Sequence, residues 1–192
     1  MKYVLILVLS LFSTGAFAQH ENEHHATDHG EAHSEHKEFK HSIAVMLGHS
    51  HIDEGRNTEG DPEWITVASF AVDYNYHFNH KWSVGLHNDI LLETFVIERY
   101  FNVGLEEEFL EREYPIASVA VVGYRVFPFL IASAGFGGEF APGENFAMIR
   151  IGVEAGFHLK DPSWELVTGI NYDARIDAYD IWNLTAGVAK RF

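Results

Sequence analysis

Alternation of apolar and polar residues runs through most of this 192-residue chain, from about residue 42 to the last residue. Successive side chains of a β-strand point to opposite faces of the sheet, so a period of two predicts strands with one apolar and one polar face. In the clearest example, the apolar series is Ala68, Phe70, Val72, Tyr74, Tyr76 and Phe78, and the polar or small series is Ser69, Ala71, Asp73, Asn75 and His77.

Eight such segments follow one another, separated by polar or turn-rich stretches. They cover residues 42–52, 64–78, 82–93, 114–127, 129–140, 146–159, 164–173 and 181–192. The connections alternate, being longer after the first, third and seventh segments and short after the second, fourth and sixth. Eight strands joined in this way predict an all-β, antiparallel up-and-down barrel, with both chain ends on the side of the short turns. We expect the last strand to close the barrel by pairing with the first.

Residues 95–113 form the longest interruption of the pattern. They mix apolar and acidic side chains without one clear period. The stretch fits either a short helix or an extended hairpin that continues the neighbouring strands, and the sequence leaves both open.

Aromatic residues on the apolar face indicate that this face points outward, into lipid. One group lies at strand ends near the long connections, namely Trp64, Tyr114, Tyr172 and Trp182. A second group lies near the short turns, namely Tyr76, Phe78, Trp82, Tyr124, Phe157, Trp164 and Phe192. Two aromatic belts around an aliphatic band are typical of a transmembrane β-barrel, whereas a soluble core needs no such sorting.

The opposite face carries charges of both signs, which we expect inside the barrel. They are Asp73, His87, Asp89, Glu93, Arg125, Glu139, Arg150, Glu154, Glu165 and Asp173. An eight-stranded barrel is only wide enough to be filled by side chains. We therefore expect Arg125, Glu139, Arg150, Glu154 and Glu165 to form a packed polar network and not the lining of an open pore.

The chain begins with a segment typical of export. One early Lys precedes an apolar run, and Ala16-Phe17-Ala18 matches a cleavage site, which predicts a signal peptide over residues 1–18. The alternative, a membrane anchor, fits less well because the run is shorter than the roughly 20 residues that a spanning helix needs. The sequence thus divides into residues 1–18, a polar segment 19–41 and a barrel 42–192. A formal net charge of −15 argues against nucleic acid as a partner.

Residues 19–41 are rich in histidine and acidic side chains, with little apolar content, and this composition predicts disorder. We take six of its histidines as candidate metal ligands: His20, His24, His25, His29, His33 and His36. Imidazole with nearby carboxylates suits zinc, copper or nickel. A solvated spacer and a pH-responsive segment are the alternatives, because His-rich tracts are only a compositional signal.

The final residues resemble a known family signal. Thr185, Gly187 and Phe192 match the pattern polar, any, Gly, any, any, apolar, any, aromatic, although Lys190 departs from it. Over residues 42–192 the chain resembles the small eight-stranded outer-membrane barrels of the OmpX and OmpA transmembrane-domain type. The resemblance implies a Gram-negative outer-membrane location, with outer-membrane lipid and, through these three residues, the barrel assembly machinery as partners. Fold likeness of this kind does not transfer a function.

For function we favour a non-enzymatic structural or binding protein, with transition metal as a possible ligand of the His-rich segment and no cofactor otherwise indicated. A small-solute or ion channel is the first alternative. A lipid-modifying enzyme is the second, and His49-Ser50-His51 offers its local nucleophile–base candidate, although alternation places Ser50 on the opposite face from both histidines. Acidic residues gather in the long connections, whereas Lys81, Lys160, Lys190 and Arg191 lie at the short-turn end.

Overall fold

A computed structural model describes residues 39–56, 62–99 and 108–192 of the chain, and these residues contain ten β-strands. The strands are β1 (His41–Arg56), β2 (Pro62–His77), β3 (Trp82–Leu91), β4 (Thr94–Arg99), β5 (Glu108–Glu113), β6 (Ile116–Phe127), β7 (Leu130–Phe140), β8 (Phe146–His158), β9 (Trp164–Arg175) and β10 (Asp180–Arg191). Within the described ranges, no helix is long and apolar enough to cross a membrane.

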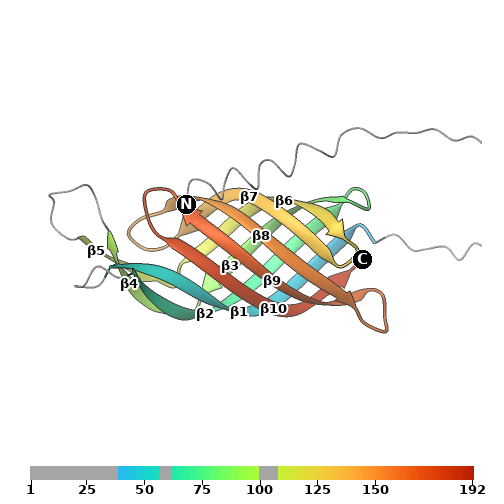
Figure 1. The fold of residues 1–192 in the computed structure, drawn as a ribbon, viewed down its shortest axis with the longest axis horizontal. Coiled ribbons are helices and arrows are strands. Elements are labelled where there is room, and N and C mark those ends of the chain that lie inside the picture. Colours follow the sequence, from blue (N-terminus) through green and yellow to red (C-terminus); the bar gives the residue numbers. More distant parts are fainter. Residues whose placement is uncertain (1–38, 57–61, 100–107) are drawn as a thin grey trace, which may run out of the picture. The chain divides into compact units, whose positions relative to one another are not determined.

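Eight of the strands close into an antiparallel barrel in the order β1-β10-β9-β8-β7-β6-β3-β2, which confirms the expected fold (Figure 1). The closure between β1 and β10 also occurs as expected, with Ile43 opposite Lys190 and Ile52 opposite Ile181. Where β1 begins and the chain ends after β10, the backbone N–H of His41 donates to the carbonyl of Phe192 at 3.0 Å. The N–H of Phe192 donates to the carbonyl of His41 at 2.9 Å. Closure pairs the backbone groups of every barrel strand on both sides, as a lipid environment requires.

The two ends of the barrel differ. At the end that we call the loop end, β1 is followed by β2, β3 by β6, β7 by β8 and β9 by β10, and the described connections there include 141–145 and 176–179. At the other, short-turn end lie the turns 78–81, 128–129 and 159–163, together with the start of β1 and the end of β10. Figure 1 shows β4 and β5 at the loop end and the C-terminus at the opposite one.

The described residues of the stretch 95–113 form two paired strands and no helix. β4 and β5 pair with each other as a separate two-stranded sheet, from Thr94 opposite Glu113 to Arg99 opposite Glu108. Of the two possibilities that the sequence left open, the extended hairpin is therefore correct for the described part of this stretch.

The connections alternate less in length than expected, because polar residues that resembled a loop extend the first two strands. β1 and β2 each have 16 residues, and Asp53 pairs with Trp64 before a bulge leads to the Arg56–Pro62 pair. Turn-forming residues at the tip of a hairpin do not prevent cross-strand hydrogen bonds where both strands already run side by side. Only the connection 92–115, which contains the hairpin, is long.

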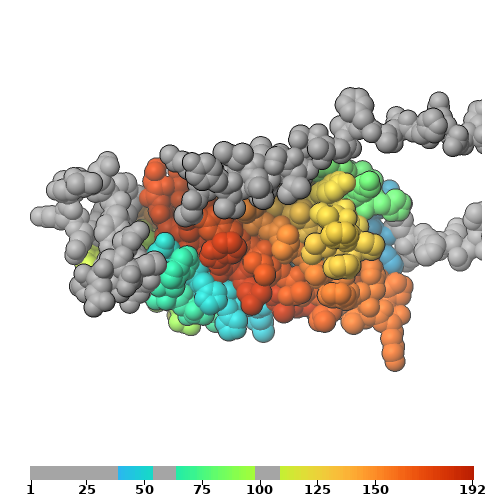
Figure 2. Space-filling view, in the orientation of Figure 1, coloured from blue at the N-terminus to red at the C-terminus, as the bar shows by residue number. Residues whose placement is uncertain are grey.

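The apolar faces of the strands point outward and the polar faces inward, as predicted. Large apolar side chains such as Leu47, Leu86 and Leu184 are exposed on the outer surface, whereas Asp73, Asp89 and Arg150 are buried inside. The visible outer wall in Figure 2 is a continuous surface of side chains over β1, β9 and β10. An outer surface with so many exposed apolar side chains is unfavourable in water and suited to hydrocarbon. The barrel therefore has the architecture of a membrane-spanning β-barrel.

Aromatic pairs mark both edges of the outer band. Tyr172 and Trp182 lie with ring centroids 4.7 Å apart near the loop end, and Trp82 and Tyr124 lie 4.8 Å apart near the short turns.

The prediction that Glu93 points into the barrel is wrong. Glu93 lies beyond the end of β3 and is exposed, because the alternation stops where the strand ends at Leu91.

Part of the barrel interior is apolar. Two small clusters lie on inward faces, one of Ala117, Val119, Val121 and Met148 and the other of Ala44, Met46, Ala71, Val167 and Ala189. The interior thus contains apolar clusters as well as the charged side chains.

Candidate functional site

Arg150 on β8 is the centre of an ion-pair cluster inside the barrel. Its Nε and Nη2 donate to the two carboxylate oxygens of Asp173 on β9, each at 2.6 Å, which is a bidentate pair. Its Nη2 also lies 2.6 Å from Oδ2 of Asp89 on β3, an ion pair without well-aligned hydrogen-bond geometry. Because β8 and β3 are not neighbours, Arg150 bridges the lumen.

Polar side chains extend this cluster along the barrel wall. Asn183 on β10 donates to Oδ2 of Asp173 at 2.9 Å, and Ser50 on β1 donates to Oδ1 of Asn183 at 2.5 Å. Nearer the short turns, His87 lies 3.3 Å from Asp73 through Nδ1 and 3.1 Å from Asn75 through Nε2. The polar side chains at these levels of the interior therefore bind each other.

Glu139 on β7 is the centre of a second cluster, nearer the loop end. Arg112 on β5 donates to its Oε1 through Nη2 at 2.6 Å, and the Tyr179 hydroxyl donates to the same oxygen at 2.5 Å. Arg175 on β9 donates to Oε2. Arg112 also donates to the carbonyl of Glu144 at 2.6 Å, so it attaches the β4–β5 hairpin to the loop after β7. Burial and the nearby Glu139 carboxylate raise the pKa of Tyr179, which lies in the 176–179 loop, against the lowering effect of Arg175.

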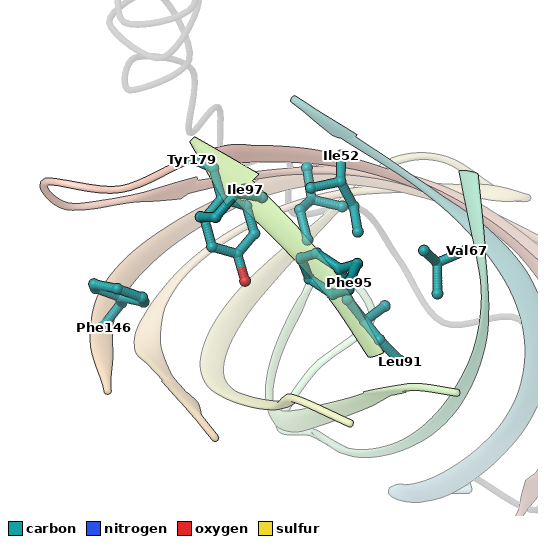
Figure 3. Close-up of a cluster of buried hydrophobic side chains, with 8 residues drawn as sticks. Ile52, Val67, Leu91, Phe95, Ile97, Phe146 and Tyr179 are labelled. Atoms are coloured by element: carbon teal, nitrogen blue, oxygen red, sulfur yellow. The ribbon is translucent and has the colours of Figure 1, made fainter. Parts of the chain in front are cut away.

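A hydrophobic cap covers the Glu139 cluster at the loop end. Its side chains are Ile52, Val67, Leu91, Phe95, Ile97, Phe146, Tyr179 and Ile181. Phe95 and Ile97 come from β4, and Figure 3 shows the cap gathered around that strand, with contributions from across the ring. Tyr179 meets Phe95 and Phe146 edge to face, with centroids 5.9 and 6.3 Å apart. The cap and the two ion-pair clusters fill the loop half of the barrel.

A small polar cavity remains in the short-turn half. Its volume is about 40 Å³, room for a few waters at most, and its polar lining includes Asn75, Glu154, Glu165, His77 and Arg125. Arg191 Nη1 lies 3.2 Å from Oε1 of Glu165 and 2.8 Å from Nε2 of His158. The charges expected to form one network therefore lie at three levels, with Arg150, Glu139 and Glu165 in separate groups.

Sequence reasoning missed Arg112, Arg175 and Tyr179, the three partners of Glu139. All three lie in or beside the connections, where the pattern of the strands ends. One signal for the β4 strand was available in the sequence. Phe95 and Ile97 alternate with Val96, so a period of two continues after β3. The partner set itself depends on the folding of the hairpin over the barrel and has no local signature.

The six candidate metal ligands, His20, His24, His25, His29, His33 and His36, lie outside the described residues, as do the predicted signal peptide and almost all of segment 19–41. His41, which closes that segment, is the first residue of β1 and stacks on Phe192 with ring centroids 5.5 Å apart. Among the described residues, no group of three or more His, Cys, Asp and Glu side chains is arranged to hold a metal ion.

The His49-Ser50-His51 stretch lies on β1 with its side chains on opposite faces, as alternation predicted. Ser50 is buried inside and bonded to Asn183, whereas both histidines are exposed on the outer surface. His51 Nδ1 lies 3.0 Å from the Thr66 hydroxyl. Neither histidine can act as a general base for Ser50, because the barrel wall lies between them.

The three residues of the C-terminal signal lie on β10 or just after it. Thr185 is buried inside, Gly187 lies against the backbone of β1, and Phe192 is exposed at the short-turn end. Their positions are those expected for the closing strand, and the recognition that the signal implies remains a prediction.

Comparison with known proteins finds likeness in fold only. No protein-family model matches the chain, and no curated protein matches it. The solved structures that align with the barrel include those of three bacterial proteins. Ail of Yersinia pestis, in complex with the heparin analogue sucrose octasulfate, is 14% identical, with 80% of this chain and 99% of that chain covered and a TM-score of 0.49.

The other two have similar values. The outer membrane protein OprG of Pseudomonas aeruginosa is 10% identical, with 80% and 97% covered and a TM-score of 0.46. Neisserial surface protein A is 15% identical, with 79% and 97% covered and a TM-score of 0.45. At such identities and TM-scores, we draw no functional conclusion from the likeness.

Proposed function

We propose that this chain is a non-enzymatic outer-membrane β-barrel protein with a structural or binding role, whose His-rich segment captures transition metal in the periplasm. The observation that carries the first part is the filled interior: two buried ion-pair clusters and a hydrophobic cap occupy the loop half of a barrel with an apolar outer surface. A barrel built in this way presents surfaces and segments to its surroundings and does not serve as a pore.

The asymmetry of the two ends supports an orientation with the short turns in the periplasm. Outer-membrane barrels have longer loops outside the cell and short turns in the periplasm. Between the described barrel strands, the longest connection joins Leu91 of β3 to Ile116 of β6 at the loop end, and β1 begins at the other end. Segment 19–41 leads into β1, which begins at His41, so in this orientation its histidines enter the periplasm, where zinc, copper or nickel would be captured.

Planar-bilayer recording of the purified protein tests the closed interior. We expect no discrete conductance steps, because the Arg150 and Glu139 clusters and the hydrophobic cap obstruct the same lumen. Discrete steps from the unmodified protein would support the alternative of a small-solute or ion channel instead.

Isothermal titration of the full mature chain with zinc, copper and nickel tests the metal-binding part. We expect binding tighter than millimolar that disappears when His20, His24, His25, His29, His33 and His36 are all replaced by Gln. The matched control replaces His49, His51 and His80, which are exposed on the barrel, and keeps binding intact. Equal binding by both variants would contradict the proposal.

A further inference from the structure

A pocket at the short-turn end gathers cationic side chains. Lys81, Arg125 and Arg191 line it together with His77 and His80, and its volume is about 470 Å³. The remaining lining residues are Phe39, Asn79, Val126, Phe127 and Pro128. None of the ten residues is acidic, in a chain whose formal net charge is −15. We call this pocket the basic mouth.

Hydrogen bonds between side chains and the backbone hold the turns that form the basic mouth. Asn79 Oδ1 accepts from the N–H groups of Lys81 and Trp82, each at 2.8 Å, which fixes the 78–81 turn. Arg125 Nη1 donates to the carbonyl of Pro128 at 2.8 Å, across the next turn. A guanidinium has five N–H donors, so this one bond orients Arg125 and leaves further donors for a ligand.

The nearby carboxylates lie deeper in the barrel or are already bound. Glu154 and Glu165 line the smaller inner cavity, which shares His77 and Arg125 with the basic mouth, and Glu165 pairs with Arg191. Asp161, on the 159–163 turn, accepts from the N–H and hydroxyl of Ser163 at 2.9 and 2.7 Å, and these bonds lower the pKa of Asp161. The surplus of positive charge therefore faces outward.

One wall of the basic mouth continues into the lipid-facing surface. Val126 and Phe127 are exposed there. Phe127 stacks on Phe129, and Phe129 stacks on Phe157, with ring centroids 6.0 and 6.1 Å apart. A row of aromatic rings beside cationic groups is suited to a molecule with an anionic head and apolar chains.

We propose that the basic mouth binds the phosphate group of an anionic phospholipid in the membrane leaflet at the short-turn end. Lys81 and Arg125 supply the charge and the N–H donors for the phosphate, and Arg191, which pairs with Glu165, lines the pocket beside them. The aromatic row from Phe127 to Phe157 borders the acyl chains. The volume of the pocket is within the range of small-ligand sites and accommodates a head group. This site is independent of metal capture by the His-rich segment.

Lipid competition in nanodiscs tests the site. The full mature chain is reconstituted with phosphatidylglycerol and phosphatidylcholine in equal amounts, and native mass spectrometry counts the lipids that remain bound. We expect phosphatidylglycerol to be retained preferentially. Each of Lys81→Gln and Arg125→Gln should lower that preference about fivefold, the loss expected for one cation near a membrane surface.

The matched control is Lys160→Gln, which removes an exposed cation on the 159–163 turn, outside the pocket lining. It should leave the preference unchanged, and the gel mobility of unheated samples verifies that every variant is folded. An equal loss in Lys160→Gln would show general electrostatic attraction and overturn the proposal, as would unchanged preference in the Lys81 and Arg125 variants. A second arm titrates inorganic phosphate into detergent-solubilised protein: tight phosphate binding without lipid preference would overturn the assignment to a lipid.

Discussion

At the scale of single residues, Arg150 shows why the interior of this barrel depends on matched charges. Its guanidinium lies within 2.6 Å of carboxylate oxygens from Asp173 and Asp89, and all three side chains are buried. Removing one partner of a buried ion pair leaves the remaining charge without compensation, which costs more than the intact pair gains.

Arg150→Met should therefore lower the free energy of unfolding by about 3–5 kcal/mol, measured by urea titration of the protein in detergent micelles. Arg125→Met is the control, because Arg125 is partly exposed and lines the open basic mouth. It should cost about 1 kcal/mol or less. Equal losses in the two variants would show that the Arg150 ion pairs are not a major source of stability.

Gly187 illustrates a second residue-scale constraint, the close contact of β10 with β1. A Cβ atom at this position would lie 2.1 Å from the carbonyl oxygen of Val45 and 2.6 Å from Cα of Met46. Both are backbone atoms, so the two strands would have to move apart. Gly187→Ala should cost about 1–3 kcal/mol in the same assay.

Gly156 is the matched position on β8, where the nearest atom to a new Cβ would be 3.6 Å away, on the side chain of Glu165. Gly156→Ala should change stability by no more than about 0.5 kcal/mol. If Gly156→Ala were the more harmful of the two, the backbone contact at Gly187 would not be the limiting feature.

At the scale of elements, the β4–β5 hairpin acts as a cover with two different faces. Phe95, on the inner face, is 6% exposed within the hydrophobic cap, whereas Phe109, on the outer face, is 61% exposed. Phe95→Ala should destabilise the protein by about 3–5 kcal/mol. Phe109→Ala, the same chemical change, should cost about 1 kcal/mol or less.

Limited proteolysis in micelles, followed as the rate of cleavage between β4 and β5, would report the loosening of the hairpin. Similar cleavage rates in both variants would contradict its role as a cover.

The closing strand β10 ends in a residue whose role we expect to lie in assembly. Phe192 is exposed and stacks on His41, so Phe192→Ser should change the stability of refolded barrel by no more than about 1 kcal/mol. Its level in the outer membrane should nevertheless fall well below that of Phe157→Ser, which removes another exposed aromatic ring at the same end. Immunoblots of membrane fractions would measure both levels. Equal levels would argue against recognition of the last residue by the assembly machinery.

At the scale of the whole molecule, the proposed metal capture and the barrel should be independent. A ligand stabilises a fold only when it binds the native state better than the unfolded one. If the six candidate histidines of segment 19–41 bind zinc without help from the barrel, saturating zinc should leave the urea midpoint of barrel unfolding unchanged while titration calorimetry shows binding. A zinc-dependent rise in the midpoint would mean that barrel residues contribute ligands.

The strand pattern, the number of barrel strands, the outward direction of the apolar face and the closure of β10 on β1 were predictable from the sequence. Each depends on a period of two, which is a local property: the side chains of Phe70 and Asp73 must point to opposite faces wherever the strand lies. The same regularity predicted that Ser50 and its flanking histidines would be separated by the barrel wall.

Tertiary structure alone decided which charges meet. Arg150 reaches Asp89 across the lumen, and Arg112 reaches Glu139 only because the hairpin folds over the loop end. The basic mouth likewise gathers Lys81, Arg125 and Arg191 from three distant parts of the chain. Alternation places a side chain inside or outside, but contacts across the interior depend on the stagger of eight paired strands and on the path of the connections, and neither has a local sequence signature.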